Sequence, residues 1–158
     1  MKKLICLFCF VSLMTVLSGQ RSIDGLFDKY SGKEGYVCLT LSGSLLKLAG
    51  TDNCIVNGSS LSADIREIRL LVRDKKEPGD EDFFKSLFKG INTRDYEELV
   101  RVRESGQDIR VLIKPEGNRV SELLLLAGGK DNFLVQIKGS MTMKEARRLS
   151  EEVKMKIN

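Results

Sequence analysis

The fold of this chain is decided by residues 97–139, which read EELVRVRESGQDIRVLIKPEGNRVSELLLLAGGKDNFLVQIKG. Four runs rich in valine, isoleucine and leucine follow one another in this stretch, and glycine, proline and asparagine separate them. Because short turns join consecutive strands, the pattern predicts an antiparallel meander. The four predicted strands are Glu97 to Glu104, Asp108 to Lys114, Val120 to Ala127 and Asn132 to Gly139.

The first hairpin of the meander predicts a sheet with one apolar and one charged face. Its loop is the pair Ser105-Gly106, and a two-residue loop fixes which residues face each other. The apolar side chains then share one side of the hairpin, and most charged side chains share the other. The predicted cross-strand pairs are Arg103 with Asp108, Arg101 with Arg110, Leu99 with Leu112 and Glu97 with Lys114.

The charged face supplies the candidate binding residues of this sequence. Arg101 and Arg110 are like charges placed directly opposite each other, which is mildly unfavourable unless an anion or an acidic partner lies against them. A solvated sheet face explains the same residues without any ligand. We predict contact with an unknown acidic envelope protein or polymer through Arg101, Arg103, Arg110 and Lys114.

The third strand is apolar without alternation, because residues 123–126 are four consecutive leucines. Such a run is typical of a strand that is covered on both faces. Glu122 points toward the apolar face if side chains alternate regularly between the two faces after the preceding turn. Either a β-bulge therefore resets the register, or Glu122 lies near the end of the sheet.

Three segments outside the meander show the spacing of amphipathic helices. One opens at Ser22 and stops at Gly32, and another begins at Thr142, where Glu145 completes a capping box. The third is rich in phenylalanine, and we interpret it as a helix lying on the sheet, with a partner-binding groove as the alternative. Its apolar stripe consists of Phe83, Phe84, Leu87, Phe88 and Ile91.

The remaining segments complete an α+β domain. We predict a single antiparallel sheet, with the meander in its C-terminal half and helices packed on its apolar face. The other predicted elements are strands at Tyr36 to Leu41 and Ile65 to Val72, a brief helix at Ser44 to Ala49 and a surface loop at Thr51 to Ser62.

The amino terminus has the pattern of an export signal. Lys2 and Lys3 precede an apolar run that is too short to span a bilayer, and small residues follow it. We predict that residues 1–19 are a cleaved signal peptide and that residues 20–158 form one globular domain. Gln20 stands where a lipoprotein would have its lipidated cysteine, so the sequence predicts a periplasmic or extracellular protein that is not lipidated and has no stable membrane insertion.

Composition after cleavage favours an ordinary solvated surface. The formal charge falls from +4 to +2 because Lys2 and Lys3 leave with the signal, and 30% of the whole chain is charged. A nearly neutral exported domain is not expected to bind nucleic acid. Of the four cysteines, two remain. Cys38 and Cys54 either form a disulfide, or Cys38 is a free thiol that fills an apolar strand position.

The chemistry of the chain is limited by its lack of histidine. Ser-His and Cys-His nucleophilic machinery is excluded, and so are metal sites that need imidazole. We predict no cofactor and no metal, and we favour a non-enzymatic binding module. The alternative is a carboxylate-dependent hydrolase or carbohydrate-active protein, which requires two acids converging in a concave pocket. A surface-assembly factor would instead show a large exposed apolar patch.

Three stretches of the chain resemble a known family. They are residues 26–35, residues 96–114 and residues 121–125 ahead of Gly128-Gly129. The sequence is similar to the exported Bacteroidetes proteins grouped as domain-of-unknown-function family 4252. That resemblance implies a location in a Gram-negative envelope. It implies no catalytic residue, since the family carries no established activity.

Overall fold

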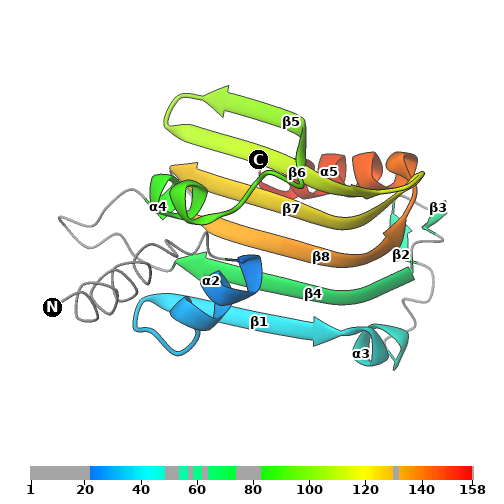
Figure 1. Cartoon of the computed structure of the whole chain (residues 1–158), viewed down its shortest axis with the longest axis horizontal. Helices are drawn as coiled ribbons and strands as arrows, with labels where there is room; N and C mark the ends of the chain where they lie inside the picture. Colours follow the sequence, from blue (N-terminus) through cyan, green and yellow to red (C-terminus); the bar gives the residue numbers. More distant parts are fainter. Residues whose placement is uncertain are drawn as a thin grey trace, which may run out of the picture.

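The computed structural model describes residues 22–48, 54–56, 59–61, 64–73, 83–129 and 132–157. Its centre is a six-stranded antiparallel sheet in the order β1-β4-β8-β7-β6-β5 (Figure 1). The predicted signal peptide, residues 1–19, lies outside the described residues. The strands are β1 (Tyr36–Ser42), β4 (Asp64–Arg73), β5 (Glu97–Glu104), β6 (Gln107–Glu116), β7 (Arg119–Gly129) and β8 (Phe133–Met141).

The predicted fold class is confirmed. Strands β5 to β8 pair with their neighbours in the chain and form the meander, and β4 joins it by pairing with β8. The short helix α3 (Gly43–Leu48) follows β1, as predicted. Within the described residues, no helix is long and apolar enough to cross a membrane.

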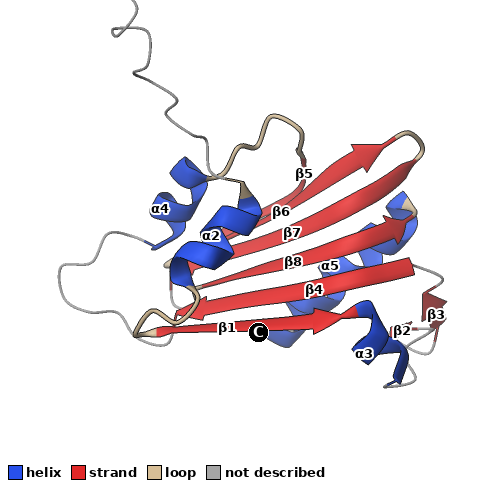
Figure 2. Cartoon of the chain, turned by 60° about the horizontal axis from the view of Figure 1, so that its bottom comes forward, coloured by secondary structure: helices blue, strands red, loops and turns tan. Residues whose placement is uncertain are grey.

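Helices lie on both faces of the sheet. Helices α2 (Ile23–Tyr30) and α4 (Phe83–Gly90) lie side by side on one face, here called the α2 face, and α5 (Met143–Ile157) lies on the other, the α5 face (Figure 2). The sequence predicted helices on one apolar face, whereas the structure has an apolar layer on each face. The layer beneath α2 and α4 contains Leu71, Leu112, Leu124, Leu126 and Leu134, and the layer beneath α5 contains Val111, Ile113, Leu123, Leu125 and Ile137.

Strand β7 is the centre of both layers. The side chains of residues 123–126 have no exposed surface, and they alternate between the two faces. The interpretation of this run as a strand covered on both faces is confirmed. The leucine run of β7 therefore favours a position in the middle of the sheet, where both faces of the strand are covered.

Two of the register shifts in the sheet bear on the predicted strand pairing. In the β5–β6 pair the register shifts at Leu99, so the predicted pairs of Leu99 with Leu112 and Glu97 with Lys114 are wrong. The extra residue allows Leu99 and Val100 both to pack on the α5 face. A second shift, between Val120 and Glu122, confirms the bulge alternative there. The pairs observed in place of the two wrong ones are Glu98 with Leu112 and Glu97 with Ile113.

The predicted loop at Thr51 to Ser62 is partly wrong. Two three-residue strands, β2 (Cys54–Val56) and β3 (Ser59–Leu61), pair with each other within it. The sequence between them is Asn57-Gly58, a pair typical of tight hairpins, and the polar composition of the segment obscured that signal.

Both well-defined helix starts follow the sequence. The Ser22 side chain accepts a hydrogen bond from the backbone N–H of Gly25 and caps α2. At the start of α5, Glu145 accepts a hydrogen bond from the backbone N–H of Thr142 at 2.7 Å, and its own backbone N–H donates to the Thr142 hydroxyl at 3.2 Å. This reciprocal pair confirms the predicted capping box.

Asp24 attaches α2 to the sheet. Its Oδ1 accepts hydrogen bonds from Arg69 of β4 at 2.8 Å and from Lys138 of β8 at 2.7 Å. The pKa of Asp24 is lowered by the hydrogen bond from Lys138 and by the positive charges of Lys138 and Arg69. Burial alone would lower the pKa of Lys138, but Asp24 and Glu67 raise it. Both partners are therefore held in their charged forms.

Replacement of Asp24 with asparagine is expected to lower the free energy of unfolding by about 1 kcal/mol at neutral pH, since the carboxylate is half exposed and its ion pairs are partly screened. The hydrogen bond from Lys138 lowers the folded-state pKa of Asp24 below its usual range. The ionised carboxylate therefore stabilises the fold at pH values above the unfolded-state pKa, and its contribution is lost as pH falls through the folded-state pKa.

Urea unfolding of the wild type and D24N between pH 2 and pH 8 measures this effect. The matched control is Asp28→Asn, because Asp28 is 80% exposed and its ion pair with Arg69 is 3.9 Å long. A stability loss that is the same for both variants, or that grows toward low pH, would contradict the assigned role of Asp24.

Candidate functional site

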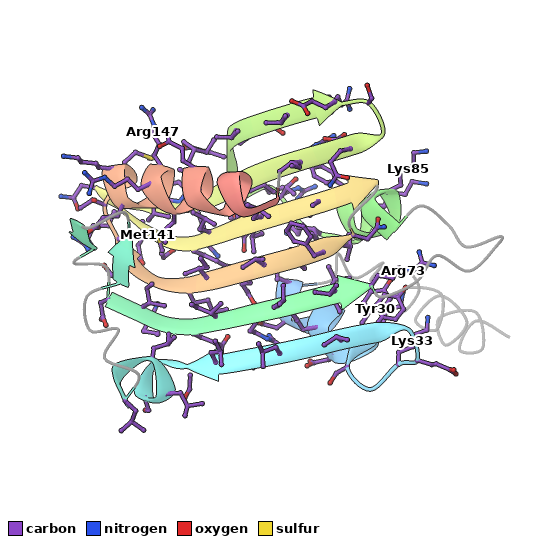
Figure 3. All side chains as sticks on the ribbon, turned by 180° about the vertical axis from the view of Figure 1, so that it is seen from behind. Tyr30, Lys33, Arg73, Lys85, Met141 and Arg147 are labelled. Atoms are coloured by element: carbon purple, nitrogen blue, oxygen red, sulfur yellow. The ribbon has the colours of Figure 1, made fainter. Side chains whose placement is uncertain are left out.

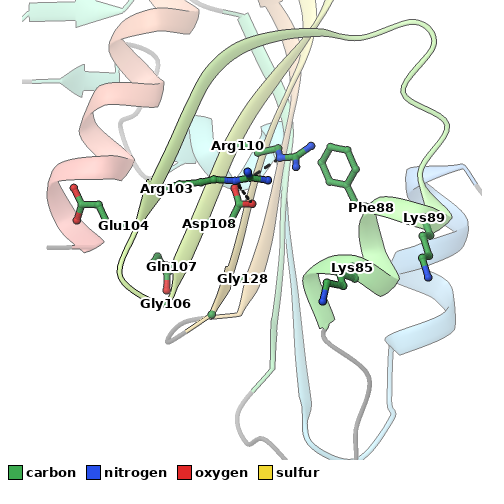
Figure 4. Close-up of a pocket in the computed structure, with 11 residues that line it drawn as sticks. Lys85, Phe88, Lys89, Arg103, Glu104, Gly106, Gln107, Asp108, Arg110 and Gly128 are labelled. Atoms are coloured by element: carbon green, nitrogen blue, oxygen red, sulfur yellow. Dashed lines mark hydrogen bonds and ion pairs between the residues drawn. The ribbon is translucent and has the colours of Figure 1, made fainter.

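A cavity of about 610 Å³ opens between α4 and the β5–β6 hairpin (Figure 4). A volume of this size is typical of sites that bind small organic ligands. Its lining comes from three elements that are distant in the sequence. The residues are Lys85, Phe88 and Lys89 of α4; Arg103, Glu104, Gly106, Gln107, Asp108 and Arg110 of the hairpin; and Gly128 and Gly129 of β7.

Helix α4 is held beside the hairpin by its apolar side. Leu87 and Ile91 are buried in the apolar layer of the α2 face, which confirms the core interpretation for these two residues of the stripe. Phe88 is only partly buried and lines the cavity, while Lys85 and Lys89, one turn apart, lie on its rim. The side chains of Phe83 and Phe84 lie outside the described residues.

The end of β7 forms a wall of bare backbone. Gly129 pairs with Gln107 and has a φ of +131°, a conformation that side chains disfavour. A Cβ atom on Gly129 would collide with the carbonyl oxygen of Gly106. The absence of a side chain at position 129 therefore allows β7 to approach the hairpin turn closely at this wall.

Arg110 is the most firmly positioned cation of the cavity. Its guanidinium carbon lies 3.9 Å from the centroid of the Phe88 ring, and its Nε lies 3.7 Å from Asp108 Oδ1. The Arg110 side chain is 14% exposed, so little solvent screens these contacts. Asp108 also accepts a hydrogen bond from Arg103 Nε at 3.1 Å, and Arg103 is 64% exposed. One arginine is therefore fixed at the base of the cavity, and the other extends into solvent.

Basic residues outnumber acidic ones in the lining by four to two. The two acids do not converge, because Asp108 lies between Arg103 and Arg110 whereas Glu104 points to the opposite side of the hairpin (Figure 4). The lining residues thus lack the pair of neighbouring carboxyl groups expected of a carboxylate-dependent hydrolase. The arrangement is instead suited to hold a negatively charged group against an aromatic surface.

The predicted binding residues separate into three groups. Arg103 and Arg110 line the cavity, and Arg101 lies directly opposite Arg110 in the sheet without lining it. Lys114 lies about 13 Å farther along β6, given the rise of a strand, with its Nζ 5.8 Å from the Tyr96 ring centroid and 3.9 Å from Asp95. The four residues therefore share a face but not a site.

Sequence reasoning missed the contribution of α4. The signal that was present is Lys85 and Lys89 at i, i+4 spacing beside Phe88, which places two cations and an aromatic ring on neighbouring parts of one helix. Their relation to Arg103 and Arg110 depends on where α4 packs on the sheet. Local sequence does not contain that information.

Cys38 is a free thiol in this structure. It packs against the apolar layer of the α2 face, and burial raises its pKa. The side chain of Cys54 lies outside the described residues, so the disulfide between Cys38 and Cys54 stays a prediction. Cys38 does not line the cavity.

Comparison with known proteins places this site within a family of unknown activity. A family model described as a domain of unknown function, DUF4252, matches residues 30–149. The match begins at the last residue of α2 and includes all six strands of the sheet and the whole lining of the cavity. No curated protein and no solved structure matches the chain.

Proposed function

Because this chain belongs to the DUF4252 family, whose description states no activity, we propose a function from the cavity between α4 and the β5–β6 hairpin. The protein is an exported, non-enzymatic binding module of the cell envelope. Its ligand carries a carboxylate or phosphate group and an apolar portion. That ligand is either a small acid or the acidic end of an envelope polymer.

The observation that carries this proposal is the stacking of Arg110 on Phe88. A guanidinium that is already ordered by an aromatic ring and by Asp108 loses little freedom when a ligand arrives. Its planar donors match the geometry of carboxylate and phosphate groups. Phe88 and the glycine wall supply apolar surface and backbone beside the charge, so the ligand is expected to be more than a bare ion.

The rim of the cavity supports attraction over a longer distance. Lys85 and Lys89 are both exposed, and with Arg103 they surround the more buried Arg110. Exposed cations contribute little energy individually, but together they accelerate the encounter with an anion at low ionic strength. Binding is therefore expected to weaken as salt is added.

The test is titration calorimetry of the processed protein with phenyl phosphate and with phenylacetate. Both probes carry the required charge and an apolar portion, and their ratio of affinities distinguishes a phosphate site from a carboxylate site. The double variant Lys85→Glu/Lys89→Glu is expected to weaken binding of the preferred probe about tenfold or more, because it reverses the charge on the rim. The apolar residues that dock α4 are left unchanged.

Two matched variants make this test specific to the cavity. Lys144→Glu/Arg147→Glu makes the same charge change at exposed positions of α5, on the other face of the sheet, and Lys114→Glu alters a predicted residue about 13 Å from Arg110 along β6. Both are expected to bind within about twofold of the wild type, as screened charges outside the site should. Failure of the wild type to bind either probe, or equal loss in all three variants, would overturn the proposal.

A further inference from the structure

We propose that β1 is the contact strand of a symmetric dimer, in which two copies of this chain pair antiparallel and form one continuous twelve-stranded sheet. The partner is therefore a second copy of the chain. This interaction lies at the edge of the sheet opposite the β5–β6 hairpin and is independent of the proposed ligand site.

Exposed apolar side chains are concentrated on β1 and α3. Of the five large hydrophobic side chains that are exposed in the described part of the chain, four lie between residues 37 and 48. Met143 of α5 is the fifth. Clustered apolar exposure of this kind marks an interaction surface, whereas isolated residues do not. The four are Val37 (54% exposed), Leu39 (47%), Leu45 (53%) and Leu48 (84%).

The two edges of the sheet differ in how they resist pairing. Edge strand β5 contains five charged residues among eight and is interrupted by the bulge at Leu99, and both features discourage a further strand. Edge strand β1 has the sequence YVCLTLS, which contains no charge and no proline. Its register with β4 is regular over all seven residues. Of the two, β1 is the edge that can accept another strand.

A two-fold axis at Leu39 makes β1 complementary to itself. In an antiparallel pair centred there, Leu39 faces its own copy, Val37 faces Leu41 of the second copy, and Cys38 faces Thr40. No like charges meet across this strand pair, so the electrostatic cost of self-association at this edge is small.

The same arrangement extends an apolar surface that is already present. Leu39 pairs with Leu70, and Leu70 pairs with Val135, so these three side chains form one row on the α5 face. Figure 3 shows this face, where α5 lies over the upper strands and no described helix lies over β1. A second copy would continue the row across the two-fold axis and cover the exposed halves of Val37 and Leu39.

Sedimentation equilibrium of the processed protein tests this proposal. The wild type is expected to show a monomer–dimer equilibrium, and Leu39→Lys to raise its dissociation constant about tenfold or more, because two lysines then meet at the axis. Met143→Lys is the matched control, since Met143 has similar exposure (44%) but lies on α5. This variant is expected to dimerise as the wild type does.

Two further measurements keep the test decisive. Circular dichroism shows whether Leu39→Lys is folded. If it is not, Leu39→Thr replaces it, because threonine is an uncharged residue that favours strands. This variant is also expected to shift the monomer–dimer equilibrium toward the monomer. Hydrogen exchange of the wild type is expected to slow in residues 36–42 as protein concentration rises. A wild type that remains monomeric would overturn the proposal, whether or not it binds lipid vesicles through these residues. Equal dissociation constants for the Leu39→Lys and Met143→Lys variants would also overturn it.

Discussion

Replacement of Leu125 with alanine is expected to lower the free energy of unfolding by about 3 kcal/mol. Leu125 has no exposed surface and lies in the central strand, in the apolar layer beneath α5. Truncation removes buried methyl groups and leaves a space that the surrounding strands cannot close, since β6 and β8 hold β7 on both sides. For a domain of this size, such a loss is a large part of the total stability.

The neighbouring substitution Leu124→Ala makes this prediction specific. Leu124 is equally buried but lies in the other layer, beneath α2 and α4. If both layers are true cores, the two variants lose similar stability in chemical denaturation, and the double variant unfolds or becomes molten. A loss below about 1 kcal/mol for either would show that its layer is loosely packed and that the fold has one core.

Replacement of Gly129 with alanine is expected to cost about 3 kcal/mol or more, although it adds one methyl group. The backbone of Gly129 has a φ of +131°, and a Cβ atom there meets the carbonyl oxygen of Gly106. Either the end of β7 must move away from the hairpin or the turn must open. Both movements deform the wall of the cavity, so the variant is expected to lose anion binding together with stability.

Gly117→Ala provides the control for this prediction. Gly117 also has a positive φ, +60°, but no atom lies within 4 Å of the position that a Cβ would occupy. Its cost is therefore confined to the left-handed backbone, about 1 kcal/mol. Thermal unfolding of both variants, combined with calorimetry of the preferred anion, separates the two causes. Equal stability losses would mean that contact with Gly106 does not limit position 129.

Turns, helix starts and buried strands of this fold were predictable because each depends on residues that are close together in the sequence. The hairpin turn at Ser105-Gly106, the capping box of Thr142 and Glu145 and the leucines of β7 each lie within a few residues of their structural consequence. Each pattern has a single physical interpretation: a tight turn, a satisfied helix end and a strand covered on both faces.

Register and long-range pairing were less predictable. The bulge at Leu99 inserts one residue because two adjacent apolar side chains both gain from burial beneath α5. Simple alternation cannot anticipate such a choice, since it depends on which helix covers that face. For the same reason only part of the candidate site could be predicted. Arg103 and Arg110 were predicted from the hairpin, but Lys85, Phe88 and Lys89 belong to a helix whose position depends on tertiary packing.

The pairing of β4 with β8 has a consequence for the order in which the sheet forms. Strands β5 to β8 are joined by short turns, so they can pair soon after the chain collapses. Strand β4 joins the meander only through β8, which lies far along the chain, and β1 is linked to the meander through β4. We therefore expect β4 and β1 to be added late in folding, with low φ-values in kinetic experiments. A dimer built through β1 would assemble only after each chain had finished its own sheet.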